Sequence, residues 1–309
     1  MKSATPKVLH EVLGRPMVWY AVDSALAAMA GRVTVVVGHG REQVEASLQS
    51  RYADAPVDTV IQHQMLGTAD AVKSASATFN NHHGPVVILS GDTPNVSTQD
   101  IGALLERHRT SGALVTLMSA IDPGEHHYGR IVRDEHGEVA RITEFKDASP
   151  AVRAVREVNM GLYVVEAAFL AESLARTTAD NAAGEFYLTD IVSMAAAHGR
   201  AQAVIAHDIA TLHGVNDRVQ LAQAAAIARD RRNLDLMRSG VTLHDPATTW
   251  IHPGVQVEAD AVIEPFVHLT GTTRVMSGAR IGSHCSLHDC DVASGAVVSP
   301  GTNLSAAKL

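Results

Sequence analysis

The sequence has little cysteine, fewer basic than acidic residues, and no long apolar run. Cys285 and Cys290 are too few to build a disulfide framework, so we expect a reducing compartment, the cytoplasm. With 25 basic against 33 acidic residues the net charge is −8, which argues against a general nucleic-acid-binding surface. No apolar run approaches membrane-spanning length, and residues 1–7 lack the apolar core of a secretory signal. We therefore expect neither nucleic acid nor a membrane as a partner.

Length and composition allow more than one folded domain. Of the 309 residues, 46% are apolar and 19% charged, as expected for a globular protein with enough material for two domains. Histidine is abundant, with 17 residues, but His82-His83 and His126-His127 are adjacent pairs in polar, turn-like surroundings. Helical metal-binding histidines are spaced four residues apart, so we interpret these pairs as surface residues.

Residues 17–119 alternate between helical and strand-like patterns. Short runs rich in β-branched residues predict strands, and amphipathic segments between them predict helices. The alternation predicts a doubly wound α/β domain, in which helices cover both faces of a parallel sheet. The first helix follows a loop, so we expect this domain to lack its first strand. The predicted strands are residues 33–37, 57–61, 86–89 and 113–119, and the predicted helices are residues 17–29, 41–51, 68–79 and 97–110.

The strand at residues 86–89 leads into a segment that suits a metal site. Ser90 and Gly91 allow a tight turn, which places Asp92 at the carboxyl end of a central, buried strand, where open α/β sheets bind ligands. A carboxylate beside a glycine that lets a ligand approach the backbone suits a divalent metal carrying phosphates. The alternative interpretation is that Asp92 caps the helix that follows.

The pattern changes after about residue 121. A turn-rich segment between two apolar stretches predicts a hairpin. Farther along, a helical run without glycine or proline ends at Gly240, a natural helix stop. The predicted elements are a hairpin of residues 128–132 and 139–145, a strand at 157–165, a helix that follows residues 184–190 and ends near residue 198, and a long helix at 216–238.

Residues 251–304 contain an internal repeat of six residues. Mostly small residues, among them Cys285, stand four positions after each aliphatic one. A hexapeptide period is typical of a parallel β-helix, in which each hexad forms a short strand and three hexads make one coil. We expect a short left-handed parallel β-helix of about three coils, with Cys285 as a buried thiol. The aliphatic residues are Ile251, Val257, Ile263, Leu269, Val275, Ile281 and Leu287, after which the period slips by one residue and continues at Val292, Val298 and Leu304.

A doubly wound domain, a long helix and a hexapeptide β-helix, in this order, resemble the GlmU family of bifunctional N-acetylglucosamine-1-phosphate uridylyltransferases and glucosamine-1-phosphate acetyltransferases. Each matching motif is weak alone, but eight of them follow the family's order along the chain. They are Pro6-Lys7-Val8-Leu9, Gln62 with Leu66-Gly67-Thr68, Gly91-Asp92-Thr93-Pro94, Tyr128-Gly129-Arg130, Glu144, Glu157-Val158-Asn159, the segment from Gly184 to Asp190, and Gly214-Val215-Asn216.

This resemblance implies transfer of a uridylyl group from UTP to N-acetylglucosamine-1-phosphate, which yields pyrophosphate and UDP-N-acetylglucosamine, a precursor of the bacterial cell wall. Positioning and charge neutralisation dominate such a reaction. By the resemblance, Asp92 and Asn216 hold Mg²⁺, and Lys7 neutralises the phosphates. The uracil-reading residues are Gln62, Gly67 and Thr68, Gly91 lies beside the metal ligand, and the sugar-binding residues are Gly129, Glu144 and Asn159.

Each of these residues also has an ordinary structural interpretation. Lys7 and Glu144 suit exposed surface charges, and Gln62 suits a polar position on an edge strand. Gly129 suits a hairpin, and Asn216 suits the N-cap of the long helix. The order of the motifs favours the functional interpretation for Asp92, Lys7, Asn159 and Asn216.

The chain departs from the family pattern at both ends. The family's opening L-A-A-G-x-G-T-R, which cradles the triphosphate, is absent, and Met1 coincides with the methionine that follows its arginine. The β-helix stops before the coils that carry the acetyl-transfer site, so we expect a chain truncated at both ends and without acetyltransferase activity. Smaller departures are Met65, Asp70, Asn95 and Asp217, which leave the exact nucleotide and sugar preference open. The expected domains are a nucleotidyltransferase domain at residues 1–214, a linker helix at 215–240 and a partial β-helix at 241–309.

Several functions remain open at this point. The first is an active uridylyltransferase, with a homotrimer through the β-helix as an open option. The second is a non-catalytic remnant or binding module, because each lost donor of the phosphate cradle would raise the barrier by about 2–4 kcal/mol. The third is a related transferase that uses another nucleotide or another sugar phosphate.

Overall fold

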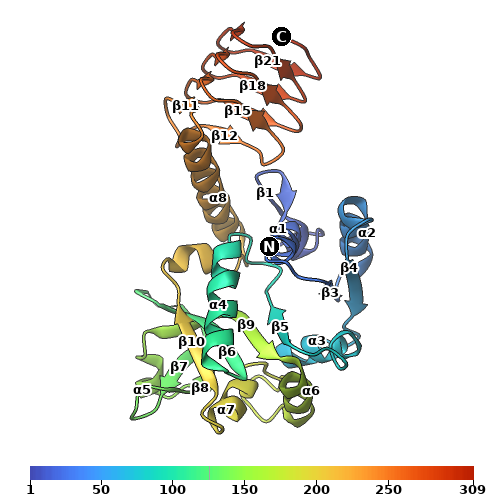
Figure 1. Ribbon diagram of the computed structural model, residues 1–309, viewed down its shortest axis with the longest axis vertical. Coiled ribbons are helices and arrows are strands. Elements are labelled where there is room, and N and C mark those ends of the chain that lie inside the picture. The colour runs from blue at the N-terminus through green and yellow to red at the C-terminus, as the bar shows by residue number, and fades with distance from the viewer. Residues whose placement is uncertain (125) are drawn as a thin grey trace. The chain divides into compact units, whose positions relative to one another are not determined.

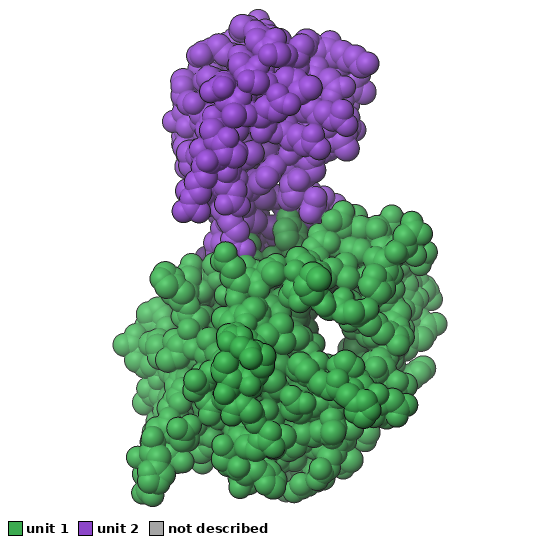
Figure 2. Space-filling view, in the orientation of Figure 1, with its two compact units in different colours: residues 1–9, 17–214 green, residues 10–16, 215–309 purple. Residues whose placement is uncertain are grey.

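A computed structural model of the chain describes residues 1–124 and 126–309, which form two compact units. Unit 1 comprises residues 1–9 and 17–214, and unit 2 comprises residues 10–16 and 215–309 (Figure 2). The main division falls after Gly214, and the short segment of residues 10–16 packs with the C-terminal unit. Among the described residues, no helix combines the length and apolar character needed to cross a lipid bilayer.

The first half of unit 1 alternates helices and strands as predicted (Figure 1). The helix predicted at residues 68–79 is shorter than expected, because Ala75 donates to Val72 and the chain tightens into a 3₁₀ turn. In chain order the elements are η1 (Lys7–Leu9), α1 (Met17–Ala27), β3 (Val33–Val37), α2 (Arg41–Tyr52), β4 (Val57–Ile61), α3 (Thr68–Ser74), η2 (Ser76–Thr78), β5 (Pro85–Ile88), α4 (Thr98–Ser111) and β6 (Val115–Ile121).

The second half of unit 1 contains the predicted hairpin and the predicted long strand. Strands β7 and β8 pair in antiparallel fashion, which confirms the hairpin. Helix α6 and strand β10 have no counterpart among the predicted elements. The elements are β7 (Arg130–Arg133), β8 (Val139–Thr143), α5 (Pro150–Arg153), β9 (Glu157–Glu166), α6 (Ala167–Arg176), α7 (Asp190–Ala196), β10 (Ala201–Ile205) and η3 (Ile209–Leu212).

The main sheet of unit 1 is mixed, so the prediction of a parallel sheet is wrong. Its order is β10-β6-β9-β7-β8, and β5 pairs with β9 beyond the end of β7. Strand β9 runs antiparallel to β5, β6 and β7, whereas β6 and β10 are parallel. The strand in the centre is therefore β9. Strand β5 is half-buried and has β9 as its one strand partner among the described residues, so the prediction of a fully buried central strand at residues 86–89 is also wrong.

Helices cover both faces of this sheet, as predicted. On one face Leu117 of β6 and Val165 of β9 pack with α6 and α7. On the other face Met118 and Val164, one residue away on the same strands, pack with Leu104 of α4. The alternation arises because successive side chains of a strand point to opposite faces.

Strands β3 and β4 form a separate parallel pair, which packs with α1 and α2 around Val22, Val37 and Leu48. In the described part of the chain, β4 is the one strand that pairs with β3. Figure 1 shows the pair standing apart from β5, and Figure 2 shows an opening through unit 1 between them. The α/β domain is therefore built from two sheets that are not joined by hydrogen-bonded strands in the described residues.

Unit 2 consists of a small hairpin, the long helix α8 and a stack of short strands. Trp250 pairs with His268 and His268 with Ser286, each one coil of three hexads apart, which confirms the parallel β-helix. Ser286 then pairs with Asn303, one residue short of that spacing, at the predicted slip. The elements are β1 (Glu11–Val12), β2 (Arg15–Pro16), α8 (Arg218–Arg238), β11 (Thr242–Leu243), β12 (Trp250–Ile251), β13 (Gln256–Val257), β14 (Val262–Ile263), β15 (His268–Thr270), β16 (Arg274–Val275), β17 (Arg280–Ile281), β18 (Ser286–His288), β19 (Asp291–Val292), β20 (Val297–Val298) and β21 (Asn303–Ser305).

The repeating aliphatic residues form the core of the β-helix. Ile251, Ile263, Leu269 and Leu287 are fully buried in one continuous cluster. Cys285 is buried among them and its thiol donates to the Ser299 carbonyl at 3.2 Å, so the prediction of a core thiol is confirmed. Each coil buries its own row of side chains, and stacking makes the rows continuous.

Candidate active site

Asp92 and Lys7 lie together in unit 1, although they are far apart in the sequence. Asp92 follows β5 in a tight turn, in which the Thr93 hydroxyl donates to the Ser90 carbonyl at 2.8 Å. Lys7 is the first residue of η1, and its Nζ lies 2.5 Å from Asp92 Oδ2. The Asp92 side chain is only 22% exposed and that of Lys7 is 39% exposed. The structure therefore brings a cation and a carboxylate from two predicted motifs to one point beside the sheet.

Asp92 does not cap the helix that follows it, so that alternative interpretation is wrong. The N-cap of α4 is Ser97, whose hydroxyl accepts from the Asp100 backbone N–H at 3.2 Å. Asp100 in turn accepts from the Ser97 backbone N–H at 2.9 Å, which completes a capping box. Since the helix end is satisfied by its own residues, the position of Asp92 needs another explanation.

The surroundings of Asp92 fit a divalent cation that is shared with phosphates. Gly214 lies against the carboxylate, since a Cβ added there would be 3.5 Å from Oδ1 and 3.6 Å from Oδ2. In the described part of the chain no three His, Cys, Asp or Glu side chains converge into a metal cage. A single carboxylate suits a divalent cation that keeps waters and completes its coordination with substrate phosphates.

Asn216 belongs to unit 2 and stands directly before α8. The N-cap of α8 is its neighbour Asp217, whose carboxylate accepts from the Gln220 backbone N–H at 2.8 Å. The backbone N–H of Asn216 donates to the Gln220 side chain at 2.7 Å. The interpretation of Asn216 as the helix cap is therefore wrong, and its role as a ligand stays a prediction.

Three residues predicted for the sugar lie together at the start of the β7–β8 hairpin. The Asn159 backbone N–H donates to the Gly129 carbonyl at 2.9 Å. A Cβ added to Gly129 would lie 3.3 Å from both Glu144 carboxylate oxygens and 2.8 Å from Ile142. Gly129 is thus required by the packing of the hairpin, and its lack of a side chain keeps the Glu144 carboxylate accessible from that direction.

Glu144 is half-buried, in contrast to a fully exposed surface charge. Burial raises the pKa of its carboxyl above the ordinary value, and the charges of Asp147, Asp190 and Glu185 raise it further. The Thr189 hydroxyl donates to Glu144 at 3.0 Å and opposes this shift. A carboxylate held in this way is a strong acceptor for hydroxyl groups.

The Asn159 side chain is held by its own strand. Its Nδ2 donates to the Tyr163 hydroxyl at 2.6 Å, and its Oδ1 accepts from the Gly161 backbone N–H at 3.1 Å. Gly161 adopts a φ of 75° near an irregularity in the pairing of β6 with β9. A bulge of this kind fixes the direction of a neighbouring side chain.

The predicted uracil segment is bound together by its own side chains. Gln62 Nε2 donates to the Gly67 carbonyl at 3.2 Å and to Asp70 at 2.8 Å. Gln62 therefore fixes the turn before α3 and is not simply a polar residue on an edge strand. The departure at Asp70 has a structural role, because it supplies the acceptor for that amide.

Gly67 and Thr68 bind the segment of residues 184–190. Gly67 has a φ of 121°, and a Cβ there would lie 2.5 Å from the Phe186 carbonyl oxygen. Phe186 donates to Leu66 at 2.7 Å, and Leu188 donates to the Thr68 hydroxyl at 3.0 Å. These contacts bind the predicted uracil segment and residues 184–190 to each other.

Sequence reasoning missed a polar cluster whose members include the chain neighbours of Gly129 and Gly214. The Tyr128 hydroxyl and His213 Nδ1 lie 2.8 Å apart in a hydrogen bond. His126 is exposed at 46%, as the surface interpretation predicts, but its ring stacks on Tyr128, lies tilted against His213 and pairs with the buried Asp122 at 2.8 Å. The one signal in the sequence was position, since Tyr128 precedes Gly129 and His213 precedes Gly214.

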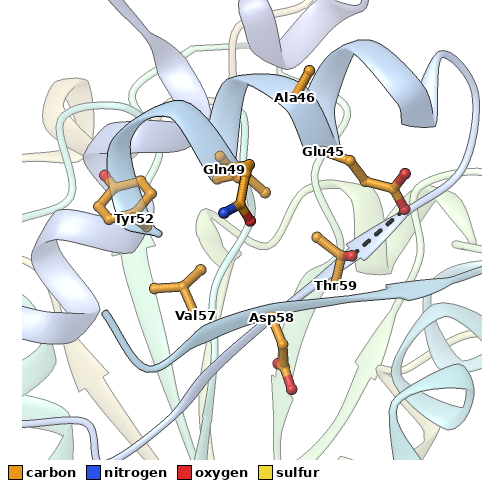
Figure 3. Close-up of a pocket in the computed structure, with 8 residues that line it drawn as sticks. Glu45, Ala46, Gln49, Tyr52, Val57, Asp58 and Thr59 are labelled. Atoms are coloured by element: carbon orange, nitrogen blue, oxygen red, sulfur yellow. Dashed lines mark hydrogen bonds between the residues drawn. The ribbon is translucent and has the colours of Figure 1, made fainter. Parts of the chain in front are cut away.

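A cavity of about 340 Å³ lies elsewhere in unit 1, between α2 and β4 (Figure 3). Glu45, Gln49 and Tyr52 line it from the helix, and Val57 and Thr59 line it from the strand. It contains none of the predicted site residues. Its charged groups are the carboxylates of Glu45 and Asp58, whereas the predicted site residues lie around Asp92 and Glu144, which we take as the candidate active site.

The chain is similar to known proteins over its whole length. The nucleotidyl transferase family profile matches residues 2–213. The bifunctional protein GlmU of Anaeromyxobacter dehalogenans (strain 2CP-C) is 46% identical over 310 residues, which covers 100% of this chain and 63% of that protein. The bifunctional protein GlmU of Trichlorobacter lovleyi is 43% identical over 100% of this chain and 67% of its own length. The chain thus spans somewhat less than two thirds of the first of these relatives.

Proposed function

This chain belongs to the nucleotidyl transferase family, among the relatives of the bifunctional GlmU proteins, and from this premise we propose that it transfers a uridylyl group from UTP to N-acetylglucosamine-1-phosphate. The products are UDP-N-acetylglucosamine and pyrophosphate. The observation that carries the proposal is the contact between Lys7 and Asp92 beside β5. It joins the two motifs from which the resemblance predicts a phosphate-neutralising cation and a metal ligand.

Mg²⁺ is the metal that this proposal requires, with Asp92 and Asn216 as its protein ligands. The carboxylate oxygens of Asp92, and Gly214, which puts no side chain against them, support this choice. When bound, the ion neutralises negative charge on the phosphates of the nucleotide. Lys7 acts at the same place as a compact charge, and exchanges its contact with Asp92 for one with a phosphate oxygen.

The sugar is held on the other side of Asp92. We propose that the Glu144 carboxylate accepts sugar hydroxyl protons and that Asn159 presents its amide, while Gly91 and Gly129 let substrate approach the backbone. Burial of Glu144 supports this role, because a desolvated carboxylate gains from each hydroxyl donor.

Uracil is read by the segment that contains Gln62, Gly67 and Thr68. Because the Gln62 amide nitrogen already donates to Gly67 and Asp70, we propose that its carbonyl oxygen and the backbone near Gly67 meet the uracil ring. The Thr68 hydroxyl holds this segment in place by accepting a hydrogen bond from the Leu188 backbone N–H.

The finer architecture is part of the same proposal. We propose that the α/β domain lacks the first strand that the resemblance implies, because β3 and β5 share no strand partner among the described residues. We further propose that α8 links the two units, that the β-helix forms a homotrimer, and that the protein works in the bacterial cytoplasm, where its two free cysteines stay reduced.

Release of pyrophosphate tests this function. The protein is incubated with Mg²⁺ and a panel of nucleoside triphosphates and sugar-1-phosphates. We expect release with UTP and N-acetylglucosamine-1-phosphate, and a much slower rate with thymidine or guanosine triphosphate or with another sugar phosphate. Faster reaction with another pair would assign a different substrate, and no release with any pair would favour a binding module.

A further inference from the structure

We propose that Tyr128 and His213 form a clamp, their hydrogen bond fixing the distance between the two halves of the site. The nucleotide half is Lys7, Asp92 and Gly214, and the sugar half is Gly129, Glu144 and Asn159. The proposal rests on the function proposed above and assigns two positioning residues to it. Tyr128 belongs to the motif Tyr128-Gly129-Arg130 and His213 to none, and neither is assigned a role from the sequence.

The place of the clamp follows from its two chain neighbours. Tyr128 directly precedes Gly129. A Cβ added to Gly129 would lie 3.3 Å from the carboxylate oxygens of Glu144, so this residue borders the sugar half. His213 directly precedes Gly214. A Cβ added to Gly214 would lie 3.5 Å from Asp92 Oδ1, so this residue borders the nucleotide half. The single hydrogen bond of 2.8 Å between Tyr128 and His213 therefore joins the backbone segments that border each half.

The electrostatics agree with a position of Tyr128 near Asp92, in the nucleotide half. Burial raises the pKa of Tyr128, and the charges of Asp122 and Asp92 raise it further, so the phenol stays protonated and lies within reach of the Asp92 charge. Burial lowers the pKa of His213, and the nearby His126 lowers it again. A neutral ring with a lone pair on Nδ1 is a suitable partner for a phenol hydroxyl.

Three further residues, His126, Asp122 and Arg130, hold the clamp in place. His126 stacks on Tyr128 at 5.6 Å and lies against His213 at 4.9 Å between ring centres. Asp122, only 2% exposed, holds the His126 ring at 2.8 Å. The buried Arg130 guanidinium donates to the carbonyls of His126 at 3.0 Å and Tyr128 at 2.9 Å, which fixes the backbone of this segment.

The spacing of the halves matters only to a ligand that spans them. UDP-N-acetylglucosamine contacts both halves at once, whereas UTP and N-acetylglucosamine-1-phosphate each occupy mainly one. When the clamp is removed, the spanning ligand must order the two halves itself and loses affinity. A fragment that contacts one half does not carry this cost. In-line transfer is more sensitive still, since a misplacement of about 1 Å costs roughly 10²-fold in rate.

A double-mutant cycle tests the clamp. The variants are Tyr128→Phe, His213→Leu, both together, and His213→Gln, which keeps an acceptor for the phenol. The dissociation constants of UDP-N-acetylglucosamine, UTP and N-acetylglucosamine-1-phosphate are measured by calorimetry with Mg²⁺. For Tyr128→Phe and for His213→Leu we expect about tenfold weaker binding of the spanning ligand and less than about twofold change for each fragment. The double variant should be no weaker than either single one, and His213→Gln should restore most of the affinity.

Tyr52→Phe is the matched control. The Tyr52 hydroxyl donates to Asp23 at 2.7 Å between α1 and α2, so its loss removes a comparable bond away from the site. This variant should leave the ratio of spanning to fragment affinity unchanged. Equal losses for all three ligands, or additive losses in the double variant, would overturn the clamp.

A second readout uses no ligand. Amide hydrogen exchange over residues 126–130 and 209–214 should accelerate to the same extent in each single variant and no further in the double variant. If the wild-type protein binds none of the three ligands, the proposed function fails while this exchange pattern still decides the clamp. Unchanged exchange in Tyr128→Phe would overturn it.

Discussion

The two units are stabilised by different kinds of contact. In unit 2 each short strand pairs with the strand one coil away, in a register that the six-residue period repeats. In unit 1 the central strand β9 pairs with β5, β6 and β7, which come from distant parts of the sequence and run antiparallel to it. A sequence period is thus enough to specify the β-helix, whereas the α/β unit depends on pairings that no local pattern encodes.

The largest expected effect is on the rate of the reaction, which the account assigns to Asp92 of unit 1. Asp92→Asn should lower the rate of pyrophosphate release about 10²–10³-fold, the usual scale for losing one electrostatic group that faces a transferring phosphoryl centre. Asp58→Asn is the matched control. Asp58 lies on β4, outside the site, and forms an ion pair with Arg32. Steady-state rates for both variants check the prediction. Equal rates for Asp92→Asn and wild type would remove Asp92 from the reaction.

The next effect probes the core of the β-helix. Ile263→Ala empties a fully buried position between two neighbouring coils, and should lower the free energy of unfolding of unit 2 by about 2–5 kcal/mol. Val297→Ala, on a side chain that is 72% exposed, should cost less than about 0.5 kcal/mol. Urea titration followed by Trp250 fluorescence measures both. A similar small change in the two variants would contradict a stack held by its buried rows.

A backbone position in unit 1 should respond more weakly. Gly67→Ala forces an L-residue into a φ of 121° and against Phe186, so it should cost about 1–3 kcal/mol. Gly102→Ala is the control, since nothing lies within 4 Å of a Cβ there and the residue is in the middle of α4. That change should stabilise by about 0.5–1 kcal/mol. Thermal unfolding of both variants, with opposite shifts in Tm, checks the pair.

The smallest effect is a pH dependence of unit 2. Burial, together with the nearby charges of His268, His288 and Arg15, lowers the pKa of His252 to about 4. The unfolded histidine titrates near 6.5, so unfolding takes up a proton between the two values. Stability from this group is present above pH 6.5 and is lost as the pH falls toward 4, by about 1–2 kcal/mol after allowance for solvent.

His252→Gln should flatten the stability of unit 2 between pH 6.5 and 4. His82→Gln, at an exposed position in unit 1, should leave the profile unchanged. Unfolding curves of unit 2 at several pH values provide the measurement. A profile that keeps its slope in His252→Gln would assign the dependence to another group.

The fold was predictable where local pattern decides it. The strands at residues 33–37 and 57–61, the hairpin and the β-helix register agree with the sequence patterns. The parallel sheet was wrong because β9 joins β5 to β6 in antiparallel fashion, and neither strand carries a signal for its partner. Strand β10 was missed because its short run, Ala201–Ile205, is only partly buried and weakly apolar.

The sequence allowed us to select candidate site residues, but it allowed fewer of their contacts to be predicted. The resemblance selected Lys7 and Asp92, and the structure places them 2.5 Å apart. The two capping alternatives were wrong because nearby residues, Ser97 and Asp217, perform the capping. The bond between Tyr128 and His213 could not be predicted, since it depends on how two distant segments meet.

One measurement tests the central claim most directly. Crystals of the protein are soaked with UTP and Mn²⁺, which replaces Mg²⁺ and is located by its anomalous scattering. The account predicts an anomalous peak in direct contact with an Asp92 carboxylate oxygen, with Lys7 moved from Asp92 to the phosphates. A nucleotide-bound peak away from Asp92, with the Lys7–Asp92 contact intact, would contradict the account.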